Sequence, residues 1–296
     1  QKYLYAVQET DPGQVSAYKR NVRTGALELL NTRPAEGVHP CHIAVDPGGH
    51  CVLAGNYSGG SVALYRLQSD GSLSALTDKV QHEGKSVNTA RQEKAHVHSV
   101  NIAPDGRNVF VADLGMDRIF SYHLDTANCR LTQGDPPFVA TKPGSGPRHF
   151  TFHPNGRFAY TILELDATAT AMRYENGILT PLQTISTLPA SYTGPNSCAH
   201  LQVSPDGRFL YASNRGHNSI VIFAIDPLSG HLTTVGHTSV GGQTPRHFTL
   251  DPSGRFLLVA NQNSDQIRVF RRNLQTGKLK STRHSVQVSM PVCLLF

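Results

Sequence analysis

The sequence contains no tryptophan and only three methionines among its 296 residues, and charged residues make up just 16% of it. It lacks any apolar run close to the roughly 18 residues that a membrane helix needs. It also lacks a signal-peptide pattern and low-complexity tracts. These absences predict a soluble globular chain that has no membrane partner.

Cysteine is scarce. The five residues are odd in number, lie far apart and form no Cys-x-x-Cys pair: Cys41, Cys51, Cys129, Cys198 and Cys293. Such a set argues against a disulfide framework and against a zinc site. Unpaired cysteines are typical of a reducing compartment, so a cytoplasmic protein is expected.

Positive charge is in modest excess, with 27 Lys and Arg against 21 Asp and Glu and a formal net charge of +6. The cations are dispersed, and the longest run is the pair Arg271–Arg272. No aromatic residues are interleaved with them, so nucleic-acid binding is not expected. An anionic small molecule is a partner that this charge allows.

The chain contains one short sequence motif repeated five times, and the first histidines of successive copies are 56, 51, 51 and 47 residues apart. The copies are HIAVDPGGHCVLAGN (His42 to Asn56), HSVNIAPDGRNVFVAD (His98 to Asp113), HFTFHPNGRFAYTILE (His149 to Glu164), HLQVSPDGRFLYASN (His200 to Asn214) and HFTLDPSGRFLLVAN (His247 to Asn261). Each copy is a strand, a Pro-x-Gly turn and a second strand, and further alternating segments complete a four-stranded unit. This period with all-β content predicts a β-propeller with four-stranded blades.

The two ends of the chain complete the count of blades. Lys2 to Val7, Val15 to Arg20 and Ala26 to Asn31 match the second, third and fourth strands of a blade, and Pro291 to Phe296 matches a lone first strand. Terminal strands that share a blade would close the ring and remove exposed sheet edges. Six blades' worth of sequence is present. Because the chain begins at Gln1 rather than Met, an N-terminal piece is expected to be absent.

Two positions of each repeat are expected on one face of the disc, because the first strand begins where its antiparallel neighbour ends. Just before the repeat histidines stand Cys41, Val97, Arg148, Ala199 and Arg246. After the second strands stand Tyr57, Leu114, Glu164, Arg215 and Gln262. Function is expected where the copies differ, and the charged residues interrupt both series.

The repeated histidines themselves have a simpler explanation. A histidine present in five copies cannot perform one catalytic task five times, so most of the five are expected to hydrogen-bond neighbouring blades. The turn glycines are expected to supply positive φ angles and no chemistry: Gly106, Gly156, Gly207 and Gly254.

The charged residues that interrupt the two series are suited to binding a negatively charged substrate. Arginine grips carboxylate or phosphate with two parallel hydrogen bonds and can stabilise an oxyanion. Glu164 or His98 could activate a water molecule or shuttle a proton. The alternative is an Arg–Glu ion pair that only bridges blades.

Two long insertions, Gln81 to Ala95 and Leu188 to Ser197, enter first strands and are expected to overhang the same face. Arg91 in the first insertion is a candidate rim contact. His96 and His98 alternate on a strand and could face one ligand or metal, but no third metal ligand is evident, so no metal is predicted.

Longer strings carry a resemblance to a known family: ARQEKAHVH (Ala90 to His98), GPRHFTFHPNGRFAYTILEL (Gly146 to Leu165), ASNRGHNSI (Ala212 to Ile220) and PCH (Pro40 to His42). Over essentially the whole chain the sequence resembles the lactonase family of seven-bladed propellers. That family includes a bacterial 6-phosphogluconolactonase and the fungal carboxy-cis,cis-muconate cyclase. The resemblance implies catalytic roles for His98, Arg148, Glu164 and Arg215. It also implies seven blades, so either the natural chain extends upstream to supply blade one, which is the expectation, or this is a closed six-bladed variant.

The expected protein is therefore a single propeller domain over residues 1–296. Its expected activity is hydrolysis of an anionic sugar lactone of the 6-phosphogluconolactone type, a reaction of carbohydrate metabolism in the pentose phosphate pathway, without a cofactor. Two alternatives remain: a muconate-type lactonizing cycloisomerase and a non-catalytic binding platform. A monomer or weak dimer is expected. Substrate contacts are expected from His42, Tyr57, Arg91, His96, His149, His200, Arg246 and Gln262.

Overall fold

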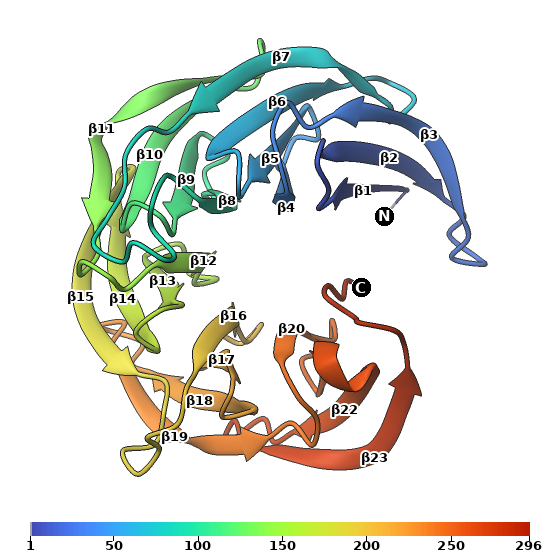
Figure 1. Cartoon of the computed structure of the whole chain (residues 1–296). Helices are drawn as coiled ribbons and strands as arrows, with labels where there is room; N and C mark the ends of the chain where they lie inside the picture. Colours follow the sequence, from blue (N-terminus) through green and yellow to red (C-terminus); the bar gives the residue numbers. More distant parts are fainter. Residues whose placement is uncertain (1) are drawn as a thin grey trace. The chain divides into compact units, whose positions relative to one another are not determined.

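The computed structural model describes residues 2–296, and nearly all of its regular structure is β-strand. The chain divides into two compact units, residues 1–147 and 148–296. Within each unit the strands of every sheet follow one another in chain order as antiparallel meanders (Figure 1). These meanders are the predicted blades, so the all-β expectation is confirmed.

The first unit holds one three-stranded and two four-stranded sheets. Their strands are β1 (Tyr3–Gln8), β2 (Gln14–Arg20) and β3 (Leu27–Pro34); β4 (Pro40–Val45), β5 (Cys51–Asn56), β6 (Ser61–Leu67) and β7 (Leu73–Gln81); and β8 (Val97–Ile102), β9 (Asn108–Asp113), β10 (Arg118–Asp125) and β11 (Arg130–Ala140).

The second unit holds three four-stranded sheets. Their strands are β12 (Pro147–Phe152), β13 (Phe158–Leu163), β14 (Thr168–Glu175) and β15 (Ile178–Ser186); β16 (Ser197–Val203), β17 (Phe209–Arg215), β18 (Ser219–Ile225) and β19 (Leu232–Ser239); and β20 (Pro245–Leu250), β21 (Phe256–Asn261), β22 (Gln266–Arg272) and β23 (Leu279–Gln287). A one-turn 3₁₀ helix, η1 (Gln262–Ser264), separates β21 from β22.

The Pro-x-Gly turns have the predicted geometry. Gly106, Gly156, Gly207 and Gly254 all have φ between 65° and 70°. A side chain is strained at such angles, so glycine is the residue that lets the first two strands of each repeat turn back on each other.

The ends of the chain agree with the sequence only in part. The three predicted N-terminal strands form the three-stranded sheet β1–β2–β3 among the described residues 2–296. β1 is only half-buried, whereas β5, its counterpart in the next sheet, is buried along its whole length. The expectation of a strand from Pro291 to Phe296 is wrong, because these residues are described without any strand pairing.

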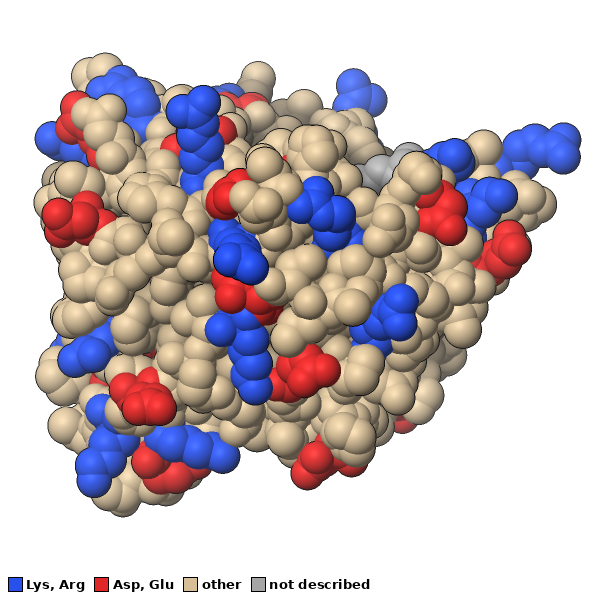
Figure 2. Space-filling view, turned by 90° about the horizontal axis from the view of Figure 1, so that it is seen from above, with Lys and Arg blue, Asp and Glu red and all other residues tan. Residues whose placement is uncertain are grey.

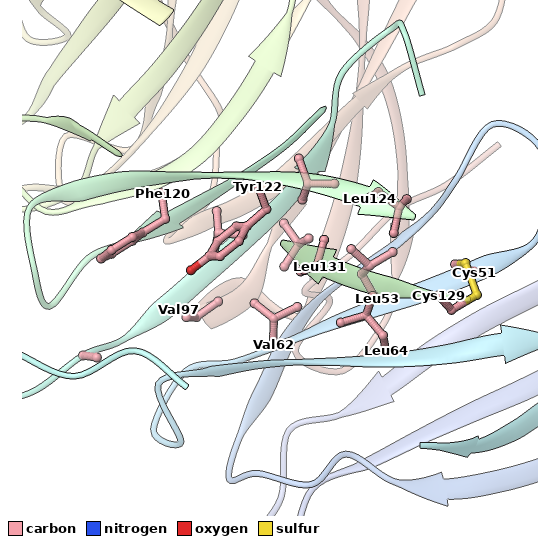
Figure 3. Packing of buried hydrophobic residues seen from close by; sticks show 14 of the residues in the cluster. Cys51, Leu53, Val62, Leu64, Val97, Phe120, Tyr122, Leu124, Cys129 and Leu131 are labelled. Atoms are coloured by element: carbon pink, nitrogen blue, oxygen red, sulfur yellow. A yellow bond between two sulfur atoms is a disulfide. The ribbon is translucent and has the colours of Figure 1, made fainter. Parts of the chain in front are cut away.

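The core of the first unit lies between its four-stranded sheets. Leu53 and Leu64 of β5 and β6 are fully buried in one cluster with Val97 of β8 and with Leu131 of β11 (Figure 3). Fully burying one such leucine stabilises a fold by about 1.5–3 kcal/mol. The alternating apolar positions of each repeat therefore hold adjacent sheets face to face.

A recurring tyrosine joins sheets of the second unit. Tyr160 of β13 donates its hydroxyl hydrogen to the Gly230 carbonyl, 3.1 Å away, and Tyr211 of β17 donates to the Gly277 carbonyl, 2.7 Å away. Burial raises the pKa of both hydroxyls, that of Tyr211 to about 12, so both stay protonated donors.

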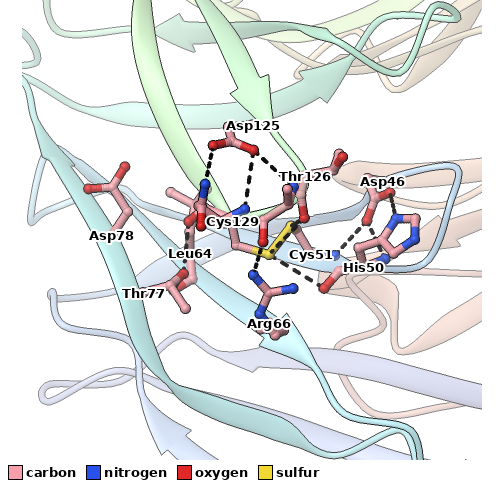
Figure 4. The surroundings of a disulfide bond; sticks show 12 residues. Asp46, His50, Cys51, Leu64, Arg66, Thr77, Asp78, Asp125, Thr126 and Cys129 are labelled. Atoms are coloured by element: carbon pink, nitrogen blue, oxygen red, sulfur yellow. Dashed lines mark hydrogen bonds and ion pairs between the residues drawn. A yellow bond between two sulfur atoms is a disulfide. The ribbon is translucent and has the colours of Figure 1, made fainter.

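Cys51 and Cys129 form a disulfide across a sequence separation of 78 residues. The expectation that disulfides are absent is therefore wrong for this pair. The bond links the start of β5 to the turn between β10 and β11, so it staples two sheets whose adjacency the spacing of cysteines does not reveal (Figure 4). Arg66 of β6 donates to the carbonyl of Ala127 in the same turn.

The remaining cysteines are not in a disulfide: Cys41, Cys198 and Cys293. Disulfides persist mainly in oxidising compartments, so the Cys51–Cys129 bond argues against a cytoplasmic location. The cytoplasmic location expected from the sequence stays a prediction. Among residues 2–296 no helix has the length and apolarity to span a bilayer. On the surface seen in Figure 2, Lys and Arg side chains lie interspersed with Asp and Glu.

Candidate active site

Three charged side chains of the second unit come from three neighbouring strand ends. Arg148 is the second residue of β12, Glu164 directly follows β13, and Arg215 is the last residue of β17. The β16–β17 register places Ser197 opposite Arg215. The start of a first strand thus lies beside the end of its second strand, as the repeat predicted, and this geometry brings the three side chains together.

Glu164 is the centre of this charged trio. Its Oε2 atom lies 2.9 Å from Arg148 Nε and 2.9 Å from Arg215 Nη2. The Arg148 Nε contact is an ion pair rather than an aligned hydrogen bond. Arg148 and Glu164 are 2% and 3% exposed, and a buried carboxylate is stable only when charges or hydrogen bonds compensate it.

Oxygen atoms of β16 also accept hydrogen bonds from both arginines. Arg148 Nη1 donates to the carbonyl of Ala199. Arg215 Nη2 donates to Ser197 Oγ at 2.7 Å and to the Cys198 carbonyl at 2.8 Å. These acceptors all belong to β16, so a single strand orients two guanidinium groups.

The trio has an excess of positive charge. Two guanidinium groups share one carboxylate, and the positive charge of Arg246 also acts on Arg215. Burial lowers the pKa of Arg215, Glu164 raises it, and Arg246 lowers it again. Buried cations in excess of anions favour a bound anion. Chemically, this arrangement can bind phosphate or carboxylate and can stabilise an oxyanion.

Histidines lie beside the trio. His149 Nε2 is 3.1 Å from Arg148 Nη1, and the Nδ1 atoms of His149 and His200 are 2.8 Å apart. His247 stacks on His200 with ring centroids 4.1 Å apart. Gln262, also predicted as a substrate contact, opens η1, and its backbone N–H donates to Thr244.

The other predicted residues lie in the first unit, where Tyr57 is their hub. Its ring stacks on His96 with centroids 4.4 Å apart and meets His98 edge-on at 5.3 Å. Arg91 donates to the Tyr57 hydroxyl at 3.4 Å. The insertion that carries Arg91 therefore folds back over the strand ends, as expected for a rim loop.

His96 and His98 have different partners. His96 Nδ1 lies 3.1 Å from the carbonyl oxygen of Tyr57, and His96 Nε2 lies 3.1 Å from the carboxylate of Glu93. Burial acts to raise the pKa of Glu93, but hydrogen bonds from its own backbone N–H and from His96 bring it below the usual value. His98 Nδ1 lies 3.7 Å from Cys41 Sγ.

The predicted structural role of the repeat histidines is visible at two of them. His42 Nδ1 accepts the backbone N–H of Val100, 3.3 Å away, and His247 Nδ1 accepts that of Leu294, 3.2 Å away. For His42 the donor belongs to β8, the first strand of the next sheet. These rings join one sheet to the chain segment beside it.

One buried network was missed by the sequence analysis. His82 Nδ1 lies 2.7 Å from Asp113 Oδ2, and His82 Nε2 lies 2.9 Å from the Tyr122 hydroxyl. Asp113 also accepts the backbone N–H groups of His96 and Gly115. The available signal was that Asp113 occupies a position held by asparagine in other copies, such as Asn56. Since Asp113 anchors the backbone of His96, the network supports the Tyr57 cluster.

Within the described residues 2–296, no three His, Cys, Asp or Glu side chains gather as a metal site.

Comparison with known proteins decides the family. The model of the Lactonase family, a 7-bladed beta-propeller, matches residues 1–296. The chain belongs to this lactonase family. Both the resemblance and the propeller fold expected from the sequence are thereby confirmed.

Two curated relatives of this lactonase-family chain carry the name 6-phosphogluconolactonase. The protein of Bacillus subtilis is 36% identical over 246 residues, which cover 82% of this chain and 69% of the relative. The protein of Formosa agariphila is 38% identical over 252 residues, covering 83% of this chain and 71% of the relative. These names support a lactone hydrolase.

Solved structures agree. A periplasmic gluconolactonase of Pseudomonas aeruginosa is 39% identical with a TM-score of 0.94, over 99% of this chain and 84% of that one. A putative 6-phosphogluconolactonase of Bacteroides fragilis is 36% identical with a TM-score of 0.93, over 99% of this chain and 83% of that one.

Proposed function

We propose that this lactonase-family protein hydrolyses an anionic sugar lactone, with 6-phosphogluconolactone as the leading substrate. The observation that carries the proposal is the buried trio of Arg148, Glu164 and Arg215, in which two cations share one carboxylate. The names of the Bacillus subtilis and Formosa agariphila relatives support the same substrate class. Such a reaction would belong to the pentose phosphate pathway.

In the proposed reaction, one guanidinium group holds the substrate's phosphate or carboxylate, and the other stabilises the oxyanion. The contacts of Glu164 with two guanidinium groups favour its ionised form, which is the form that can accept a proton. Water attacks the lactone carbonyl carbon while Glu164 takes its proton. The tetrahedral intermediate then collapses, the ring C–O bond breaks, and the proton passes to the departing oxygen.

The sequence offered His98 as a second candidate for the proton acceptor, and its role stays a prediction. His98 lies in the first unit, where its ring is next to Cys41 and Tyr57. No cofactor is needed for the proposed hydrolysis.

The test is a panel of lactones on the purified protein, beginning with 6-phosphogluconolactone and with spontaneous opening subtracted. We expect saturable hydrolysis that is faster for anionic lactones than for neutral ones. A muconate-type diacid in the same panel tests the cycloisomerase alternative. A protein inert toward every lactone and toward the diacid would contradict the proposal and favour the binding-platform alternative.

A further inference from the structure

Arg148 determines where the proton lies on the neighbouring histidine. Its Nη1 atom is 3.1 Å from His149 Nε2. A guanidinium group has hydrogen-bond donors and no acceptor. His149 Nε2 must therefore accept this hydrogen bond, and it carries no proton.

The contact between His149 and His200 fixes the tautomer of a second histidine in the same way. A neutral imidazole has one N–H, so the proton of His149 lies on Nδ1. That atom is 2.8 Å from Nδ1 of His200, which must then accept. The proton of His200 therefore lies on Nε2. The hydrogen bonds point one way, from Arg148 through His149 to His200, and we call these three residues the donor line.

Adding a proton to either ring would break the donor line. A second proton on His149 would place an N–H against the Arg148 guanidinium, and one on His200 would place two N–H groups face to face. The charged groups of this region include Arg148, Arg215 and Arg246, Glu164 between the first two, and Asp166, which acts on the neighbouring Cys198. Their positive excess also opposes a further cation. His247, stacked on His200, accepts Leu294 N–H through Nδ1 and is neutral as well.

We infer that His149 and His200 are neutral positioning residues with fixed tautomers, which hold the Arg148 guanidinium in place rather than bind the substrate or move a proton. His149 supplies one acceptor for Arg148 Nη1, and the Ala199 carbonyl supplies another. With Glu164 at Nε, acceptors on two sides orient the guanidinium plane. The tautomers follow from geometry alone, whereas the catalytic consequence rests on the proposed function.

Long-range nitrogen–proton NMR correlations on the intact protein at neutral pH distinguish histidine tautomers. The expected result is an Nδ1–H tautomer for His149, the minor form of a free histidine side chain, and Nε2–H tautomers for His200 and His247. Finding His149 protonated on Nε2 or on both nitrogens would overturn the inference, whatever the protein's substrate is.

A matched pair of variants tests the positioning role. His149→Gln keeps an oxygen that can accept from Arg148, whereas His149→Leu has no acceptor. We expect His149→Leu to lower kcat/KM about tenfold or more, as a misplaced substrate-binding group does, and to abolish the single tautomer of His200. His149→Gln should retain most of the activity.

His247→Gln is the control, because His247 contacts His200 but lies outside the donor line. It should keep both the activity and the His149 tautomer. Equal losses in His149→Gln and His149→Leu, with both variants folded, would overturn the positioning role. If the wild-type protein hydrolyses no lactone, the proposed function fails, while the NMR spectra still decide the tautomers.

Discussion

Two groups of arginine and carboxylate side chains within residues 148–296 each contain a buried arginine, and they differ in their balance of charge. Arg272 Nη2 meets Asp206 at 2.7 Å and 3.0 Å, one cation to one anion. The remaining donors of Arg272 reach the Tyr211 hydroxyl at 2.9 Å and the Gly254 carbonyl at 3.1 Å. In the trio, Arg148 and Arg215 both pair with the Glu164 carboxylate.

Burial does not distinguish the two groups, since Arg148 and Arg272 are 2% and 4% exposed. The balance of charge does distinguish a structural ion pair from a candidate binding site. The balanced pair joins the turn between β16 and β17 to β22, and it leaves no net charge for a ligand to compensate. An unbalanced group keeps net positive charge in a desolvated place, which a bound anion can neutralise. The trio also joins two sheets through Arg215 and Glu164, so the bridging ion pair considered from the sequence stays an alternative, and the excess of cations is the feature that favours an anion site.

The largest expected effect is on stability at the balanced pair. Asp206→Ala leaves the buried Arg272 without its counter-charge and should lower the free energy of unfolding by about 3 kcal/mol. Urea denaturation measures this, and Asp206→Asn, which keeps an acceptor, should lose less. Turnover per folded molecule should not change. A large loss of turnover in folded Asp206→Ala would erase the distinction between the two contacts.

At the trio the effect should be on catalysis. Glu164→Gln removes the charge and the proton acceptor but keeps the side-chain size, and should lower kcat about 100-fold, within the usual range for a general base. Steady-state hydrolysis of the preferred lactone measures it. Glu175→Gln, the same change at the exposed last residue of β14, serves as the matched control. Turnover near the wild-type level in Glu164→Gln would move the proton acceptor to another group.

Replacing one arginine of the trio should have a smaller effect. Arg148→Ala is expected to lower kcat/KM at least roughly tenfold, equal to a loss of about 1.4 kcal/mol of transition-state binding. Arg148→Lys should recover little, because an ammonium group cannot reproduce the planar fork of donors. Near-normal kcat/KM in Arg148→Ala would reject the assigned site.

The smallest expected effect is a pH dependence of stability that appears only at acidic pH. Burial acts to raise the pKa of Asp206, but hydrogen bonds from Ser204 and Arg272 and the charge of Arg272 bring it below the usual value. The folded state therefore holds this proton less tightly than the unfolded chain. The resulting stabilisation is present above the unfolded pKa of about 3.9. It is lost as the pH falls through the lower folded pKa.

Denaturation of wild type and Asp206→Asn across that range measures this dependence. The stability difference between the two should be constant at neutral pH and shrink below pH ~4. A difference that instead changes between pH 6 and 8 would assign the dependence to histidine.

The sequence predicted features that repeat or that break a repeat. The copies located the strand pairs, and the charged departures from them identified Arg148, Glu164 and Arg215, which do contact one another. A strand repeat reports on its own sheet, since alternation reflects which face is buried. Departures from it are visible because the remaining copies define the expected residue.

Contacts between sheets were much harder to predict. The Cys51–Cys129 bond and the network of His82 with Asp113 join residues that are 78 and 31 positions apart. Their partners depend on which sheets adjoin and on how loops return, and neither is encoded in a local pattern. The donor line was likewise hidden, because tautomers depend on the atoms that face each ring.

The disulfide has a practical consequence for anyone who prepares this protein. Produced in a bacterial host without an oxidising folding pathway, the chain would carry two thiols where the structure has a bond across a separation of 78 residues. In the chain-entropy model, a protein loses about 4 kcal/mol of folding stability when a loop of that size is not closed by its disulfide. Measurements of activity or stability should therefore begin with a thiol titration of each recombinant batch.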